Sequence, residues 1–118
     1  MEYLRHISSG QFISSGPWIH PDRCITSNEL IVVTEGVVFI EEDSSRFTLR
    51  SGDVVYLRKN HPHRGFQVSE EKTSFYWVHF EQTPPFSFRT LTLSDPYPAV
   101  SLLRQLLHYA NTPTYPAA

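Results

Sequence analysis

Three histidines and one glutamate are the residues whose types and spacing could support chemistry. His61 and His63 form the single His-x-His pair of the sequence, in a polar stretch, and His79 stands near the end of a long apolar run. Neutral imidazoles suit first-row metals, and a carboxylate such as Glu29 would complete a four-ligand set. His-x-His pairs are also common as ordinary loop residues. We therefore expect no metal or other cofactor, and keep these four residues as the set that would bind one.

The second chemical candidate is Trp77, in the apolar run at residues 73–80. If this run is a strand, Phe75, Trp77 and His79 lie on one face and Tyr76 lies on the other. Both faces are largely apolar, which predicts a strand covered on both sides. Trp77 is then either a core residue or part of a cavity wall where its indole stacks on a sugar or another flat ring. Alternation alone leaves both possibilities open.

Familiar catalytic templates are absent from the sequence. It has no Gly-x-Ser-x-Gly elbow and no glycine-rich phosphate loop. The acidic run at residues 41–43 suits a solvated hairpin end, and Cys24 has no activating neighbours. These features favour a binding protein over an enzyme.

Composition narrows the class further. The 118 residues suit one domain, and 40% apolar, 14% aromatic and 19% charged residues are typical of a folded protein. The net charge of −2 provides no basic excess for binding nucleic acid. A single cysteine excludes an internal disulfide, and neither a signal peptide nor a membrane-spanning run is present. We expect a soluble cytoplasmic protein without a membrane partner.

Short strand candidates dominate the middle of the chain. Turn residues recur near positions 36, 44, 52, 60 and 70, and they separate candidates at 29–34, 37–42, 46–49, 54–57, 64–68 and 73–80. This spacing is typical of an antiparallel sandwich or barrel. Residues 1–27 are expected to be mostly irregular.

A helix is predicted near the C-terminus. Asp95-Pro96 resembles an N-cap followed by a first-turn proline, and residues 96–110 carry an apolar stripe. The stripe either packs on the barrel or awaits a dimer partner or a further domain. The expected layout within a single domain, 1–118, is an N-terminal arm (1–16), a barrel (17–80), a connecting segment (81–95) and this helix.

Five stretches taken together resemble a known family. They are WIHPDR at 18–23, ELIVVTEG at 29–36, SGDVVYL at 51–57, HPHRG at 61–65 and FYWVHF at 75–80. Their order and spacing are similar to those of cupins, and in particular to the N-terminal sensor domain of AraC-type bacterial transcription regulators. The resemblance covers nearly the whole chain.

The resemblance implies a mainly β, cupin-like antiparallel barrel or jelly roll (double-stranded β-helix) with a C-terminal helix and a ligand pocket inside the barrel. Trp77 falls on the position where a member of the family stacks its sugar, and Glu35 falls on a polar ligand contact. By the same resemblance, His63 and Tyr56 are expected to line the cavity and Arg23 to meet an anionic group. The arm at 1–16 is expected to close over the ligand.

The sequence departs from the metal-binding cupin motifs. Of the four usual ligands, Glu29 and His63 are present, whereas the other two positions fall on Arg23 and Ile25, or on Asp22 and Cys24. This departure argues against metal-dependent dioxygenase or isomerase chemistry and for a cavity that only binds.

The expected function is therefore that of a non-enzymatic sensor. A small-molecule effector, a sugar or another small metabolite, would bind in the barrel of a homodimer, and DNA would be bound only by a C-terminal helix-turn-helix domain beyond these residues. One alternative is a metal-dependent cupin enzyme. The other is a dimerisation module whose collapsed barrel is filled by Phe39, Tyr56, Phe75 and Trp77.

Overall fold

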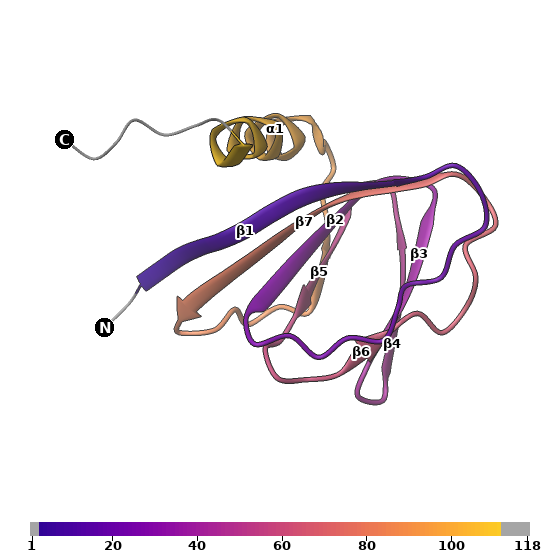
Figure 1. Ribbon diagram of the computed structural model, residues 1–118, viewed down its shortest axis with the longest axis horizontal. Helices are drawn as coiled ribbons and strands as arrows, with labels where there is room; N and C mark the ends of the chain where they lie inside the picture. Colours follow the sequence, from indigo (N-terminus) through magenta and orange to yellow (C-terminus); the bar gives the residue numbers. More distant parts are fainter. Residues whose placement is uncertain (1–2, 112–118) are drawn as a thin grey trace.

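Two antiparallel sheets form the framework, and one helix lies outside them (Figure 1). The computed structural model describes residues 3–111, with side chains through residue 108. The larger sheet has the strand order β1-β7-β2-β5-β8 and the smaller one the order β4-β3-β6. In chain order the elements are β1 (Tyr3–Ser14), β2 (Asn28–Glu35), β3 (Val37–Glu42), β4 (Ser45–Arg50), β5 (Asp53–Leu57), β6 (His63–Arg64), β7 (Thr73–Thr83), β8 (Thr90–Thr92) and α1 (Tyr97–Asn111).

The architecture confirms the predicted mainly β antiparallel fold. β2 to β5 and β7 appear where the turn residues placed strands, whereas the candidate at 64–68 shrinks to the two residues of β6. Residues 81–95, expected to be a connecting segment, include regular structure: β7 continues to Thr83, and β8 pairs with β5. The Pro-rich stretch 112–118 lies outside the described residues.

β1 is the main correction to the sequence reading. Residues 3–14 were expected to be largely irregular, yet they form a strand that pairs with β7 from Tyr3 opposite Thr83 to Ser14 opposite Thr73. Local alternation is weak here, since Tyr3, Leu4, Ile7 and Ile13 are all exposed. The strand forms because β7 offers a full edge of backbone hydrogen-bonding groups. The described part of the expected arm is thus an edge strand of the larger sheet.

A glycine makes the corner at which the chain passes from one sheet to the other. Gly36, between β2 and β3, has a φ of 76°, which side chains disfavour, and a Cβ there would lie 2.6 Å from the Thr73 hydroxyl oxygen. The corner lets β2 end in the larger sheet and β3 begin in the smaller one.

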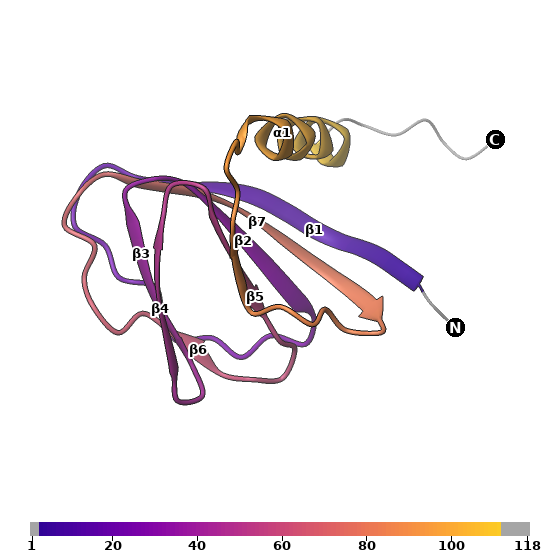
Figure 2. The same ribbon diagram turned by 180° about the vertical axis from the view of Figure 1, so that it is seen from behind.

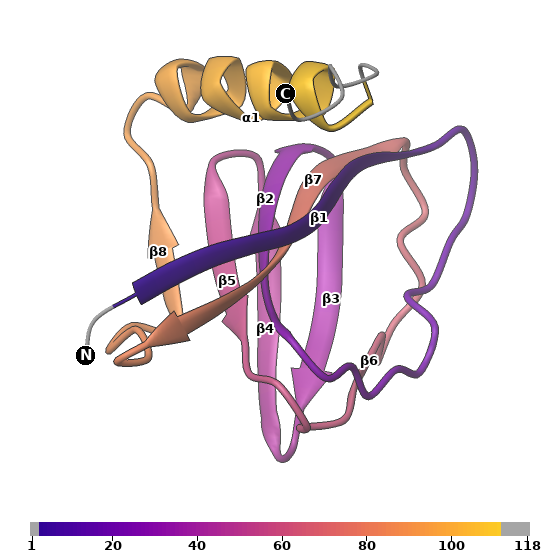
Figure 3. The same cartoon turned by 60° about the vertical axis from the view of Figure 1, so that its left-hand side comes forward.

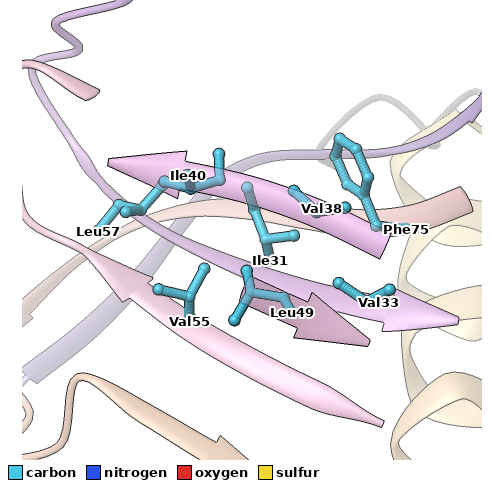
Figure 4. Close-up of a cluster of buried hydrophobic side chains, with 8 residues drawn as sticks. All are labelled: Ile31, Val33, Val38, Ile40, Leu49, Val55, Leu57 and Phe75. Carbon is cyan, nitrogen blue, oxygen red and sulfur yellow. The ribbon is translucent and has the colours of Figure 1, made fainter. Parts of the chain in front are cut away.

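The hydrophobic core lies between the two sheets (Figure 4). Its members come from the inward faces of β2, β3, β4, β5 and β7, and each is buried: Ile31, Val33, Val38, Ile40, Leu49, Val55, Leu57 and Phe75. Alternation along these strands turns the intervening residues outward. Burial of this hydrophobic cluster determines which face of each strand points into the core.

The outer face of the larger sheet is covered by two later segments. Tyr56 on β5 packs edge-on against Phe86 at 5.4 Å, and Phe80 on β7 lies 5.6 Å from the same ring. α1 lies along this side of the molecule (Figure 2), and Arg104 donates a 3.0 Å hydrogen bond to the Tyr76 hydroxyl. Among the described residues no helix has the length and apolar character needed to span a bilayer.

The predicted helix is present, one residue further along than expected. The Asp95 carboxylate accepts a 3.1 Å hydrogen bond from the backbone N–H of Tyr97, which confirms it as the N-cap. Part of the apolar stripe meets the sheet, whereas Leu102 and Tyr97 are 65% and 72% exposed. The helix therefore covers the barrel with one side only.

Candidate ligand-binding cavity

A cavity of about 230 Å³ opens on the inner face of the larger sheet. The chain between β1 and β2 passes β6 before it enters β2 (Figure 3), and residues 18–23 of this segment form one side of the cavity. We call it the barrel cavity; it is lined by Phe12, Trp18, His20, Pro21, Arg23, Glu29, Phe75, Trp77 and His79.

Strand register directs the β7 side chains into the barrel cavity. Trp77 lies opposite Ile31 of β2, and His79 lies opposite Glu29. Directly opposed residues of an antiparallel pair share a face, and Ile31 is a fully buried core residue. Trp77 and His79 therefore point inward, which answers the question that alternation had left open.

Four rings, which we call the aromatic wall, form the apolar side of the cavity: Phe12, Trp18, Phe75 and Trp77. The ring centroids of Phe12 and Trp18 are 4.4 Å apart, and those of Phe12 and Phe75 are 5.1 Å apart. β1 leaves room for the indole of Trp77, because its opposing residue is Gly10 and the indole occupies the space a Cβ would need. The result is a rigid apolar surface suited to a flat ring.

Three polar residues of the lining, His20, Glu29 and His79, together with His63 behind Glu29, form what we call the polar end. The Nε2–H of His79 donates to Glu29 Oε2 at 3.1 Å, and His63 Nε2 lies 3.6 Å from Glu29 Oε1, too far for a hydrogen bond. The Nδ1–H of His20 donates to the carbonyl of Pro21 at 2.7 Å. The rings of His20 and His63 lie 5.2 Å apart.

His63 is a buried polar group without a partner. His63 is 2% exposed, and neither nitrogen of its ring has a hydrogen-bond partner. The backbone is well anchored, because the N–H and C=O of His63 pair with those of Arg23 at 2.8 and 2.9 Å. Leaving a buried imidazole without hydrogen bonds lowers the stability of the fold.

Burial also controls the charge of the polar end. Loss of hydration lowers the pKa of His63 and of His20, and the positive charge of Arg23 lowers both further. The carboxylate of Glu29 opposes these effects without overcoming them. The imidazoles of His20 and His63 are therefore mainly neutral at pH 7.

These lowered pKa values predict a loss of stability on mild acidification. Between the folded-state pKa and the ordinary value of 6.5, the unfolded chain binds more protons than the folded one, so the free energy of unfolding falls as pH drops below 6.5. The slope is at most about 1.4 kcal/mol per pH unit for each histidine. Urea unfolding from pH 7.5 to 5.5 measures it. His63→Gln is expected to flatten the slope and His6→Gln, at an exposed position, to leave it unchanged; equal slopes in all three would contradict the assignment.

The structure brings several of the predicted site residues together. Trp77 and Arg23 both line the barrel cavity, and so do Glu29 and His79 from the reserve metal set. His63 lies immediately behind Glu29. These residues come from β2, β6, β7 and the segment before β2, so only tertiary structure could assemble them.

Glu35 and Tyr56 are not brought to the cavity. Glu35 ends β2 beyond a register irregularity, and its half-exposed carboxylate lies 4.0 Å from Lys72 in a groove beside α1. Tyr56 lies between inward-facing Val55 and Leu57, so alternation turns it to the outer face, where Phe86 packs on it. Burial raises the pKa of its hydroxyl.

His61 also lies away from the polar end. Its Nδ1 is 2.8 Å from Asp43 Oδ2, and with Glu42 these are the one set of three whose candidate ligand atoms lie within 4.8 Å of one another among the residues the structure describes. Glu42 and Asp43 are already paired with Arg58, and Glu42 also with Arg89. Neutralised carboxylates of this kind are part of the fold rather than a cation site.

The polar end does not fit a resident metal ion as it stands. The imidazoles of His63 and His79 approach different oxygens of the Glu29 carboxylate, Oε1 and Oε2. His79 already donates a hydrogen bond to Oε2. A metal ligand must offer a lone pair and not a hydrogen, and the donors must converge on one point. The geometry is that of a hydrogen-bonding site.

Sequence reasoning missed His20, Phe12 and Trp18 as cavity residues. His20 and Trp18 fall in the stretch WIHPDR, but their roles depend on how that segment folds back over β6. Phe12 depends on β1 joining the sheet, which local pattern did not show. The signal that could have identified these residues is the aromatic side chains in residues 3–14 and 18–23.

Comparison with solved structures places the fold among cupins. A cupin superfamily protein from Desulfitobacterium hafniense matches with a TM-score of 0.55 and 10% identity, covering 69% of this chain and 78% of the other. Oxalate decarboxylase from Bacillus subtilis matches with a TM-score of 0.54 and 15% identity, covering 92% of this chain and 31% of that enzyme. At these identities the likeness is one of fold, and it confirms the predicted cupin-like jelly roll.

Sequence comparison is more specific. The chain is 30% identical over 76 residues to YisR, an uncharacterised helix-turn-helix-type transcriptional regulator of Bacillus subtilis. The match covers 64% of this chain and 26% of that regulator, so the chain spans about a quarter of its relative's length. Residues 16–111 match the family described as the AraC-like ligand binding domain, which includes every residue of the barrel cavity except Phe12. The chain belongs to the AraC-like ligand-binding domain family.

Proposed function

We propose that this domain binds a small effector in the barrel cavity and that binding controls a DNA-binding domain elsewhere in a longer regulator. The observation that carries the proposal is an aromatic-walled cavity of about 230 Å³ that also has a buried carboxylate, that of Glu29, in its lining. A collapsed barrel is not supported, because Phe39 and Tyr56 turn outward and leave the space open.

Binding is favoured over catalysis by the arrangement of the polar end. Glu29 is held by His79, no serine or cysteine lines the cavity among the described residues, and the imidazoles do not converge on one point. A general acid and base need access to reacting atoms from positions set for proton transfer. Oxalate decarboxylase, an enzyme with a similar fold, is only 15% identical to this chain in sequence, so the likeness concerns the fold and not the activity. These observations support a non-enzymatic sensor.

Cavity size limits the effector to a small metabolite. Pockets for drug-sized ligands run from about 300 to 1,000 Å³, so a cavity of about 230 Å³ suits a molecule with one ring. A sugar is one such class, because its apolar face stacks on an indole such as that of Trp77. Other small metabolites with a flat face fit the same wall.

β1 offers a route from the cavity to the helix. Phe12 lines the barrel cavity, whereas its neighbours Gln11 and Ile13 line the groove between the sheet and α1. A ligand that favours one position of β1 would therefore shift α1 as well, by population shift between two arrangements. In this proposal β1 plays the part expected of the N-terminal arm.

Homodimerisation through α1 is the second part of the proposal. Leu102 and Tyr97 are exposed on a helix that covers the barrel with one side only. A second copy packed against α1 would remove exposed apolar surface of this kind from water. Sedimentation equilibrium of the purified chain tests this; a monomer up to 100-fold above the starting concentration would contradict it.

The experiment for effector binding is a thermal-shift and tryptophan-fluorescence screen of the purified chain. Sugars, amino acids, organic acids and amines form the panel, and Trp18 and Trp77 report directly because both line the cavity. At least one compound is expected to give a saturable response. A silent panel, with tight stoichiometric binding of zinc, manganese, nickel or iron instead, would favour the metal-dependent enzyme and overturn the proposal.

A further inference from the structure

The charges around the barrel cavity point to a more specific ligand class, an inference that rests on the proposed function. Two charged side chains line the cavity, Glu29 and Arg23. Glu29 is buried, at 6% exposure, and Arg23 is at the exposed rim. The ends of the cavity therefore differ in sign, negative inside and positive at the entrance.

Glu29 lacks a fixed cationic partner. Among the described residues, the basic groups within 4.0 Å of its carboxylate are the imidazoles of His63 and His79, and no lysine or arginine is among them. A buried carboxylate is stabilised by a charged donor more than by a neutral one. Among the described residues no group donates a hydrogen bond to Oε1, since His63 Nε2 stays 3.6 Å away. This oxygen is therefore available to accept a hydrogen bond from a ligand N–H group.

Arg23 provides a positive charge at the rim of the cavity that can bind an anionic group of a ligand. Backbone pairing with His63 holds its main chain beside the polar end, and its guanidinium has no carboxylate within 4.0 Å among the described residues. A free guanidinium binds a carboxylate through two parallel hydrogen bonds. Arg23, Glu29 and His20 all line the same cavity.

A ligand with a single charge would satisfy one of these groups and be repelled by the other. A cation would face Arg23 at the entrance, and an anion would meet Glu29 in a low-dielectric interior. A zwitterion matches both, and a flat apolar substituent would use the aromatic wall that remains.

We propose that the effector is an α-amino acid with a flat apolar side chain. Its ammonium group binds Glu29, its carboxylate binds Arg23, and its side chain lies against the aromatic wall, chiefly Trp77 and Phe12. The cavity size admits one such molecule.

Calorimetry and fluorescence titration of the purified chain with matched probes test this assignment. L-Phenylalanine and L-tyrosine carry both charges; 2-phenylethylamine lacks the carboxylate, 3-phenylpropionate lacks the ammonium, and 3-phenyllactate replaces the ammonium with a hydroxyl. At least one amino acid is expected to bind 10-fold or more tightly than all of its single-charge analogues.

Two variants assign each charge to its partner. Glu29→Gln is expected to weaken the amino acid and the amine by 10-fold or more and to leave 3-phenylpropionate unchanged or tighter. Arg23→Gln is expected to weaken the amino acid and 3-phenylpropionate and to spare the amine. Glu70→Gln and Arg50→Gln, at exposed positions outside the cavity, serve as charge-matched controls, and circular dichroism checks the fold.

The outcomes separate this inference from the proposed function. Tighter binding of a sugar, or of a probe with one charge, would overturn the amino-acid assignment and leave the effector-binding function in place. Equal affinities across the amino acid and its analogues would also overturn it, and this comparison requires only the unaltered chain. Failure of every probe and of the wider screen would overturn both.

Discussion

Replacing Trp77 with alanine is expected to abolish effector binding, with at least a 100-fold loss of affinity. The indole is the part of the aromatic wall that β7 aims into the barrel cavity, opposite Ile31 and over Gly10. Its removal takes away one of the two indole surfaces of the cavity and leaves empty space beside Gly10. Titration of Trp77→Ala with the compound found in the screen, followed through Trp18 fluorescence, measures the loss.

The same variant has a stability cost that must be separated from the binding loss. A buried tryptophan replaced by alanine costs about 3–5 kcal/mol, and Trp77 is partly exposed, so we expect a value near the lower limit. Phe39→Ala is the matched control, because Phe39 is a partly buried aromatic residue that packs on Phe66 outside the barrel cavity. It should lose stability and keep affinity. Undiminished affinity in Trp77→Ala would show that another ring binds the effector.

Substitution of Gly10 by alanine is expected to weaken effector binding by displacing the Trp77 indole from the side of β1. The new methyl group would occupy space now held by the indole, lying 2.6 Å from Trp77 Cε2 and 2.8 Å from Nε1. Such contacts are too close, so either the ring moves into the cavity or β1 moves away from β7. Overpacking of this kind costs about 1–3 kcal/mol, and we expect a 10-fold or greater loss of effector affinity.

Gly16 provides the matched control for this substitution. A Cβ at Gly16 meets no atom within 4 Å, so Gly16→Ala should change neither affinity nor thermal midpoint by a measurable amount. In Gly10→Ala the displaced indole should also shift the tryptophan emission maximum. Normal binding and an unchanged spectrum would mean that β1 absorbs the methyl group without moving Trp77.

The two substitutions also address how the signal leaves the cavity. Gly10 and Phe12 face the cavity, while Gln11 and Ile13 on the same strand face the groove beside α1. A change that pushes β1 outward therefore reaches the helix directly. This arrangement makes β1 the natural link between ligand and helix in the proposed regulator.

Local pattern predicted the strands of the barrel because their causes are local. β2, β3 and β5 are rich in branched residues, and turn-forming pairs such as Glu35-Gly36 and Ser51-Gly52, whose glycines both have positive φ, separate the strands. The helix followed from a capping aspartate and a stripe of leucines. β1 escaped because its pairing with β7 joins residues about seventy positions apart and leaves little trace in its own hydrophobic pattern.

The amino-acid sequence by itself determined the fold class, the places where strands end and the family resemblance, and it predicted Trp77 and Arg23 as site residues. Tertiary structure alone decided which face of each strand looks inward, and so excluded Tyr56 and Glu35 from the cavity and brought in His20 and Phe12. The physical reason is that alternation assigns residues to two faces without saying which one is buried. That choice is made by register and packing, when Ile31 and its neighbours enter the core and carry Trp77, Glu29 and His79 to the same side.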